Sequence, residues 1–298
     1  MEQPGLDYQI ENGNFRNLAR ALTKVENELP GSQEILRNLN TPSKCIVLGI
    51  TGPPGAGKST LVNGIINQLS AQHKRVAVVA IDPTSPFNLG SLLGDRIRMS
   101  EQFNKPNVYI RSLATRGSLG GLSAKTIEIV DVLKSAGFDY ILVETVGVGQ
   151  SEVEIAGLAD ITIVVLVPES GDEIQSIKSG LMEIADIFVV NKADREGAET
   201  FANTLRKLVH QKTEHVSVIK TIADRSEGIS ELMKAVGDHT NKESNRKSFL
   251  LSEKAWKLIQ HRLMAPIDKK KLQLDIAEAS KKPDFNLYRF VDGVLMNS

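Results

Sequence analysis

The stretch Gly52-Pro53-Pro54-Gly55-Ala56-Gly57-Lys58-Ser59-Thr60 decides the fold of this 298-residue chain. It follows the apolar run 45–50 and precedes a segment with helical periodicity that begins near Lys58. A glycine-rich turn between a strand and a helix, ending in Gly-Lys-Ser, is the P-loop pattern, in which backbone N–H groups surround bound phosphates. The stretch therefore predicts a phosphate-binding loop within an α/β fold.

Each part of this loop has an expected role. Gly55 and Gly57 let the backbone wrap closely, and the helix N-terminus adds positive potential. We expect Lys58 to reach the β- and γ-phosphate oxygens and Ser59 to bind Mg²⁺. Pro53 stands where partition-type ATPases carry lysine, which disfavours that class of ATPase.

Apolar runs alternate with helical patterns along the middle of the chain. Continuous Val/Ile/Leu runs indicate strands covered on both faces, hence a mostly parallel central sheet flanked by helices. The predicted strands are residues 45–50, 76–81, 108–110, 140–143, 161–167, 187–190 and 216–220.

Helical patterns also extend the chain at both ends. Apolar residues recur at steps of three and four over residues 15–29, Pro30-Gly31 follows, and a short helix is expected at 32–39. After residue 228 the pattern is helical through Ser298. We predict an N-terminal helical extension (1–42), a P-loop domain (43–240) and a C-terminal helical arm (241–298).

A second motif, Asn191-Lys192-Ala193-Asp194, follows the predicted strand 187–190, where a loop can reach a base across the carboxyl edge of the sheet. The Asp194 carboxylate accepts hydrogen bonds from guanine N1–H and its amino group, whereas adenine presents an acceptor at N1. The segment with Ile222, Ala223 and Asp224 follows the next strand and is expected to face guanine O6. Together the two motifs predict a GTP hydrolase.

Carboxylates at the ends of strands are candidate Mg²⁺ partners. Glu144 ends the strand 140–143 and could hold the ion directly or through water, while the Gly147 N–H could meet the γ-phosphate. Asp82 ends the strand 76–81, and Asp95 lies within 93–99. For these last two, an ordinary helix or turn cap remains the alternative.

The water-orienting glutamine that follows the switch glycine in Ras-like proteins is absent from its usual place. Val148 stands there, and Gln150 comes two positions later. We therefore predict slow hydrolysis by the isolated protein, with a partner completing the site.

Five segments, taken in order, resemble the MeaB/ArgK family. They are 52–60, 81–86, 93–99, 144–152 and 171–178, and the similarity runs from about Asn17 to Leu232. The resemblance implies a GTPase chaperone of adenosylcobalamin-dependent methylmalonyl-CoA mutase, which gates cofactor loading and protects or reactivates the mutase. It also implies that Asp82, Asp95 and Glu144 are the Mg²⁺ and switch carboxylates.

The same resemblance implies a third switch loop at 171–178 facing the mutase and a homodimer formed by the C-terminal arm. Without it, residues 171–178 would be a solvated helix start. An apolar stripe that includes Trp256, Ile259 and Leu263 could serve the dimer, although packing on the core explains it as well. Asn88-Leu89-Gly90 replaces the family's usual glycine pair, which puts the flexibility of that switch in question.

Composition limits the partners, the cellular compartment and the competing functions that the sequence allows. Lys and Arg total 36, as do Asp and Glu, so we expect no general attraction to nucleic acid or to a membrane. One cysteine, Cys45, fits a reducing compartment, and the absence of a long apolar run favours a cytoplasmic protein. The competing interpretations are a metallochaperone GTPase, for which the histidines are scattered, and a kinase of an amino-acid (lysine/arginine/ornithine) transport system.

Overall fold

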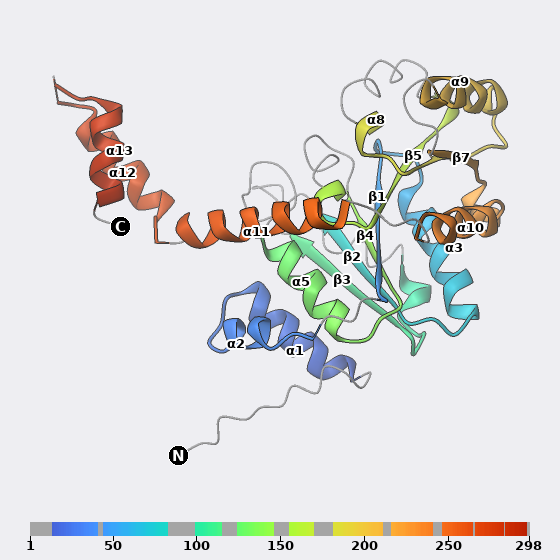
Figure 1. Ribbon diagram of the computed structural model, residues 1–298, viewed down its shortest axis with the longest axis horizontal. Helices are drawn as coiled ribbons and strands as arrows, with labels where there is room; N and C mark the ends of the chain where they lie inside the picture. The colour runs from blue at the N-terminus through green and yellow to red at the C-terminus, as the bar shows by residue number, and fades with distance from the viewer. Residues whose placement is uncertain are drawn as a thin grey trace. The chain divides into compact units, whose positions relative to one another are not determined.

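The computed structural model describes residues 14–40, 44–82, 99–114, 124–145, 155–169, 181–210, 216–240, 246–264, 266–282 and 284–296. Seven strands form one sheet (Figure 1). They are β1 (Ile46–Thr51), β2 (Val76–Asp82), β3 (Val108–Ala114), β4 (Tyr140–Glu144), β5 (Ile161–Leu166), β6 (Ile187–Val190) and β7 (Ser217–Lys220).

The strand order is β3-β2-β4-β1-β5-β6-β7, and every pairing is parallel. The chain therefore builds one half of the sheet from β2 to β4 on one side of β1, then crosses to build β5 to β7 on the other. Loops after β1, β4, β5 and β6 all leave the carboxyl edge around this switch point, which is where open α/β sheets bind ligands.

Alternate residues of the strands belong to opposite faces of the sheet, as the two-residue period of a strand requires. Leu48 and Ile50 share one core with helices α3 (Lys58–Ala71) and α10 (Ile229–Thr240). Val164 and Phe188 belong to a second core with α9 (Ala198–His210). The sheet thus has helices on both faces, which confirms the predicted fold class.

Helix α3 holds the loop after β1 in place because one of its faces is buried against the sheet. Its fully buried side chains follow a three- and four-residue spacing, and each large one contributes about 1.5–3 kcal/mol to folding. They are Leu61, Val62, Ile65, Ile66 and Leu69.

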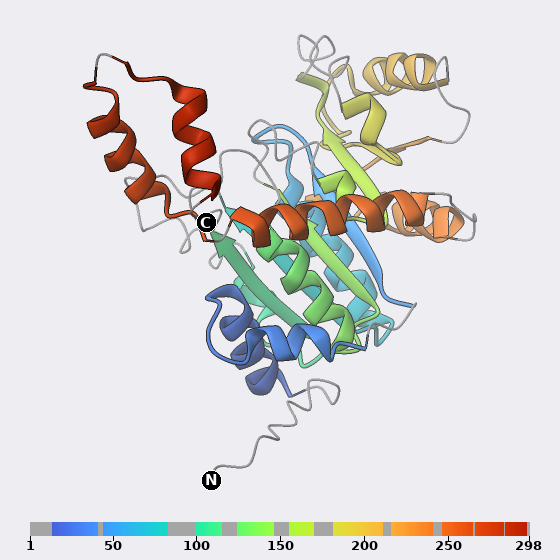
Figure 2. The same ribbon diagram turned by 60° about the vertical axis from the view of Figure 1, so that its left-hand side comes forward.

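At the N-terminus, α1 (Phe15–Glu26) and α2 (Ser32–Arg37) lie beside α5 (Ala124–Ser135) in both views (Figures 1 and 2). Lys125 of α5 bonds Glu28 at 2.8 Å. The predicted helix 15–29 ends earlier, at Glu26, because Asn27 caps it and Glu28 adopts a positive φ of 53°. Leu29 consequently lies beyond the helix and is exposed.

The first of two compact units, residues 1–250, also includes, among its described residues, the short turns η2 (Ser100–Gln102), η3 (Ile155–Gly157) and η5 (Ala223–Arg225) and the short helix α8 (Leu181–Ile184). Helix α11 (Arg246–Met264) runs into the second unit, residues 251–298, which also holds α12 (Lys269–Ala279) and α13 (Leu287–Met296). The predicted domain limits at 42/43 and 240/241 stay predictions. Within the described ranges, every helix is too short or too polar to cross a bilayer.

Candidate functional site

Positive φ angles shape the loop between β1 and α3. Gly52, Gly55 and Gly57 have φ of 134°, 78° and 86°, a region that favours glycine. A Cβ on Gly52 would lie 2.1 Å from the Val165 carbonyl oxygen, so a side chain cannot fit there without moving β5. The loop is thus pressed against the neighbouring strand at the carboxyl edge of the sheet.

Lys58 folds back over this loop. Its ammonium group is buried and donates hydrogen bonds to the carbonyl oxygens of Gly52 at 2.7 Å and Pro53 at 2.9 Å. A buried ammonium group next to a helix N-terminus can bind an anion when it turns away from these carbonyls. The arrangement can bind the phosphate groups of a nucleotide.

Two further side chains meet beside the loop. The Ser59 hydroxyl donates a 2.7 Å hydrogen bond to Oε1 of Glu144, which ends β4 next to β1. Behind them, buried Thr145 donates to the hydroxyl of Thr51 at 2.9 Å. Hydroxyl and carboxylate oxygens are the ligands that Mg²⁺ prefers, so the Ser59–Glu144 pair fits a divalent-cation site.

Asn191 ties three loops together from a position that is 2% exposed. Its amide nitrogen donates to the Ala56 carbonyl at 2.9 Å, and its oxygen accepts from the Thr221 hydroxyl at 3.0 Å and the Ala223 N–H at 3.2 Å. These bonds fix the loops after β1, β6 and β7 relative to one another, and we call the three loops so linked the frame around Asn191.

Lys192 strengthens the same frame. Its φ of 55° turns the chain after β6, and its ammonium group donates to the Gly55 carbonyl at 2.8 Å. The next residue, Ala193, donates its N–H to the Thr221 carbonyl at 3.0 Å. Asp194 follows on this braced loop with its side chain 40% exposed, so its carboxylate can accept hydrogen bonds from a ligand.

Comparison with known proteins agrees with this geometry. The family described as methylmalonyl Co-A mutase-associated GTPase MeaB matches residues 18–271. The chain belongs to the MeaB family of GTPases.

Several relatives of this MeaB protein have names that refer to a GTPase or to methylmalonic aciduria. A Pyrococcus abyssi protein named as a GTPase is 46% identical over 263 residues, covering 86% of this chain and 81% of the relative. The mouse methylmalonic aciduria type A homolog is 41% identical over 226 residues, 73% of this chain and 54% of the relative. GTPase ArgK of Escherichia coli is 40% identical over 191 residues, 62% and 58% of the two chains. The predicted enzyme class, a GTP hydrolase, is confirmed.

A crystal structure of a LAO/AO transport system kinase shares the fold of this MeaB protein. Its TM-score is 0.67 at 24% identity, over 96% of this chain and 93% of that one. A HypB hydrogenase maturation factor of Archaeoglobus fulgidus has a TM-score of 0.50 at 17% identity, over 76% of this chain and 100% of that one. Both likenesses concern the fold alone.

The structure brings most of the predicted site residues of this MeaB protein to one edge of the sheet. Asp82 ends β2 at that edge, although its side chain lies outside the described part. Asp95, Gly147, Gln150 and the segment 171–178 also lie outside the described residues.

Sequence reasoning missed two features of this region. Thr51 ends β1 and Thr145 directly follows β4, and the buried hydrogen bond between their hydroxyls, which no motif indicated, links the two strand ends. Arg225 was also unmarked, yet its guanidinium lies 3.7 Å from the Asp194 carboxylate.

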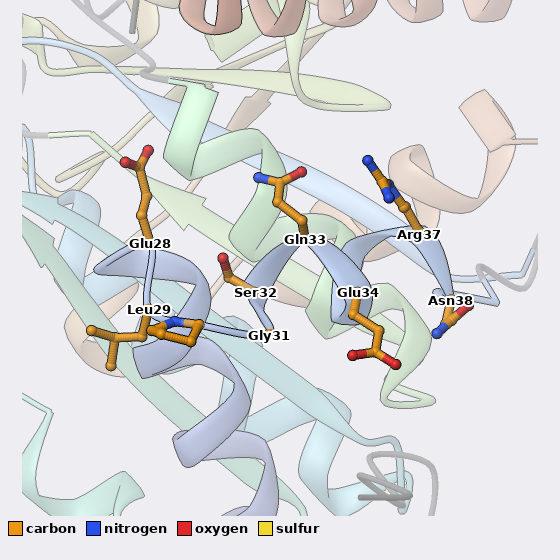
Figure 3. A pocket seen from close by; sticks show the side chains of 9 residues that line it. Glu28, Leu29, Gly31, Ser32, Gln33, Glu34, Arg37 and Asn38 are labelled. Atoms are coloured by element: carbon orange, nitrogen blue, oxygen red, sulfur yellow. The ribbon is translucent and has the colours of Figure 1, made fainter. Parts of the chain in front are cut away.

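A hollow near α1 and α2 is separate from this site. It is lined by residues 28–34, 37 and 38, whose side chains Figure 3 shows, most of them polar. Leu29 and Pro30 form its apolar part, and its lining includes no residue of the loops after β1, β6 or β7. We assign no function to this hollow.

Proposed function

We propose that this MeaB protein is a Mg²⁺-dependent GTPase switch that serves as a chaperone of an adenosylcobalamin-dependent methylmalonyl-CoA mutase. One observation carries the proposal: Asn191 and Lys192 bond the carbonyls of Ala56 and Gly55, so a base-reading loop and a phosphate-binding loop share one frame. A nucleotide can then be held at both ends by a rigid site.

In this proposal Lys58 leaves the carbonyls of Gly52 and Pro53 to bind the β- and γ-phosphates, while the loop N–H groups surround the same oxygens. Ser59 and Glu144 would hold Mg²⁺, whose chemistry when bound is to neutralise charge on the phosphates. The roles of Asp82, Asp95, Gly147 and Gln150 remain sequence-based predictions.

Guanine would be selected by Asp194, because its carboxylate accepts from N1–H and the 2-amino group. The segment with Ile222, Ala223 and Asp224 would line the opposite side of the base. Its backbone is braced, since Ile222 pairs with Glu227 and Ala223 donates to Asn191. A site that pairs such donors discriminates strongly against a base that presents an acceptor there.

The family description and the name of the mouse relative support the choice of a mutase as partner. Hydrolysis would change the order of the loops that meet the γ-phosphate, and so change affinity for the mutase. We place the protein in the cytoplasm, as the sequence predicts.

We further propose that the second unit mediates a homodimer. Most of the exposed large apolar side chains of the described residues lie in it, among them Trp256, Ile259 and Leu263, and its helices α12 and α13 bury none of their residues within the unit. An apolar surface of this kind is typical of protein interfaces.

The test measures phosphate release from GTP with Mg²⁺, with and without a purified methylmalonyl-CoA mutase. We expect slow release alone, marked stimulation by the mutase, and little release from ATP. Equal turnover of ATP would contradict the base assignment, and an unchanged rate with mutase would contradict the partner. Transfer of labelled phosphate to a protein acceptor would instead favour the kinase interpretation.

A further inference from the structure

The carboxylate proposed to read guanine already has a cationic neighbour within the chain. Nη2 of Arg225 lies 3.7 Å from Oδ2 of Asp194, a distance that makes an ion pair but exceeds a hydrogen bond. The Arg225 side chain is 60% exposed and that of Asp194 is 40% exposed. The pair therefore lies at the mouth of the base site, where a ligand can reach it.

The backbone that carries Arg225 is fixed. The Arg225 N–H donates to the Ile222 carbonyl at 3.0 Å, Ile222 pairs with Glu227, and Ser226 turns the chain with a φ of 58°. The hydrogen bonds of Asn191 and Ala193 hold this turn against the loop with Asp194. The exposed arginine side chain can therefore move away from the carboxylate without disturbing this backbone.

The guanidinium group resembles the edge of guanine that Asp194 would read. It presents a planar fork of N–H donors that matches the two oxygens of a carboxylate. Guanine presents N1–H and the 2-amino group, two donors joined through one carbon, to the same oxygens. Arginine and base therefore require the same acceptor atoms.

We propose that Arg225 is an internal competitor for guanine, pairing with Asp194 in the empty site and leaving it when the base binds. This rests on the proposed function, because it needs a guanine nucleotide at this site. Arg225 then weakens the binding of GDP and GTP to the same extent, because it stabilises the empty site. It sets the affinity for guanine nucleotides rather than taking part in catalysis.

The expected effect is modest because both side chains are partly exposed. Ion pairs of this kind correspond to about a 1.5- to 5-fold change in an equilibrium constant. Arg225→Ala should tighten GDP binding by that factor, because binding no longer has to break the ion pair.

Arg195→Ala is the matched control. Arg195 directly follows Asp194 in the chain and is similarly exposed, but it bonds Glu169 and lowers the pKa of that carboxyl group through this hydrogen bond. This variant removes the same charge from the neighbourhood without freeing Asp194. We therefore expect no tightening of GDP binding.

The experiment compares GDP affinity and dissociation rate, by calorimetry and stopped-flow fluorescence, for the wild type and the two variants. A second pair tests Arg225→Ala in an Asp194→Asn background with xanthosine diphosphate. The asparagine carries no charge to attract the arginine, so the tightening should disappear.

Unchanged or weaker GDP binding by Arg225→Ala would overturn the inference. The same tightening by Arg195→Ala would also overturn it, since the effect would then be general electrostatics. Wild-type protein that binds no GDP would refute the proposed function itself, whereas tight and identical GDP binding by the wild type, Arg225→Ala and Arg195→Ala would refute only the role of Arg225.

Discussion

Asn191→Ala should both destabilise the first unit and weaken nucleotide binding. The substitution removes three hydrogen bonds, to the Ala56 carbonyl, the Thr221 hydroxyl and the Ala223 N–H. At about 0.5–1.5 kcal/mol each, the free energy of unfolding should fall by roughly 2–4 kcal/mol. The value lies in the upper half of that range if water cannot enter, because Asn191 and Thr221 are only 2% and 1% exposed.

Urea denaturation followed by circular dichroism would measure this loss, with titration of a fluorescent GDP analogue in parallel. A fall of this size corresponds to roughly 4–15 °C in the melting temperature of a domain of this length. Asn203→Ala is the control, since Asn203 is exposed on α9 and its side chain bonds those of Arg206 and Glu199 on the same helix. It should change stability by less than about 0.5 kcal/mol.

Unfolding of Asn191→Ala at the wild-type urea midpoint would contradict this role of the asparagine. A variant that is destabilised but binds the GDP analogue with wild-type affinity would also contradict it, because the asparagine would then support the fold without shaping the site.

Three other substitutions or treatments test the remaining parts. Lys58→Ala should abolish tight GTP binding in calorimetry while the fold persists, since the loop loses its buried cation; wild-type affinity would exclude the P-loop assignment. Asp194→Asn should weaken GTP binding and permit xanthosine triphosphate, because the amide offers one donor and one acceptor; an unchanged preference for guanine would contradict this. Burial raises the pKa of the Cys45 thiol from 9.0 to about 12, so native protein should resist iodoacetamide at pH 8 and react only when unfolded. The same shift implies that stability falls as pH rises through this range, because the unfolded thiol ionises first; rapid native labelling would refute the burial.

The strands could be predicted from sequence because burial on both faces leaves a continuous apolar run. The run 187–190 coincides with β6, every residue of which is buried. The weakest case was β3, predicted as 108–110 and observed as Val108–Ala114. Arg111 and Ser112 interrupt its apolar pattern, but β3 is at the edge of the sheet, where its side chains reach solvent and the ladder with β2 continues.

The residues of the site could be named from two motifs, but their contacts could not. Lys58 and Ser59 were expected to face a nucleotide, and the structure shows what they bond within the chain itself. Asn191 was predicted as a base-site residue, yet its three bonds go to protein groups of other loops. Such pairings depend on which strands are neighbours, and a local pattern does not encode the order of strands.

The frame around Asn191 has a consequence for how a nucleotide would bind. Asn191 and Lys192 bond consecutive residues of the phosphate loop, Ala56 and Gly55, so ordering one loop also orders the other. The entropy of positioning the two loops is lost when the chain folds rather than when the ligand binds, which favours affinity. A nucleotide with the wrong base cannot avoid the unfavourable contact with Asp194 by shifting its phosphates, because the loop with Asp194 and the phosphate loop cannot move apart. Guanine selectivity should therefore appear in the affinity for the whole triphosphate. Asn191→Ala should reduce the affinity and the selectivity together.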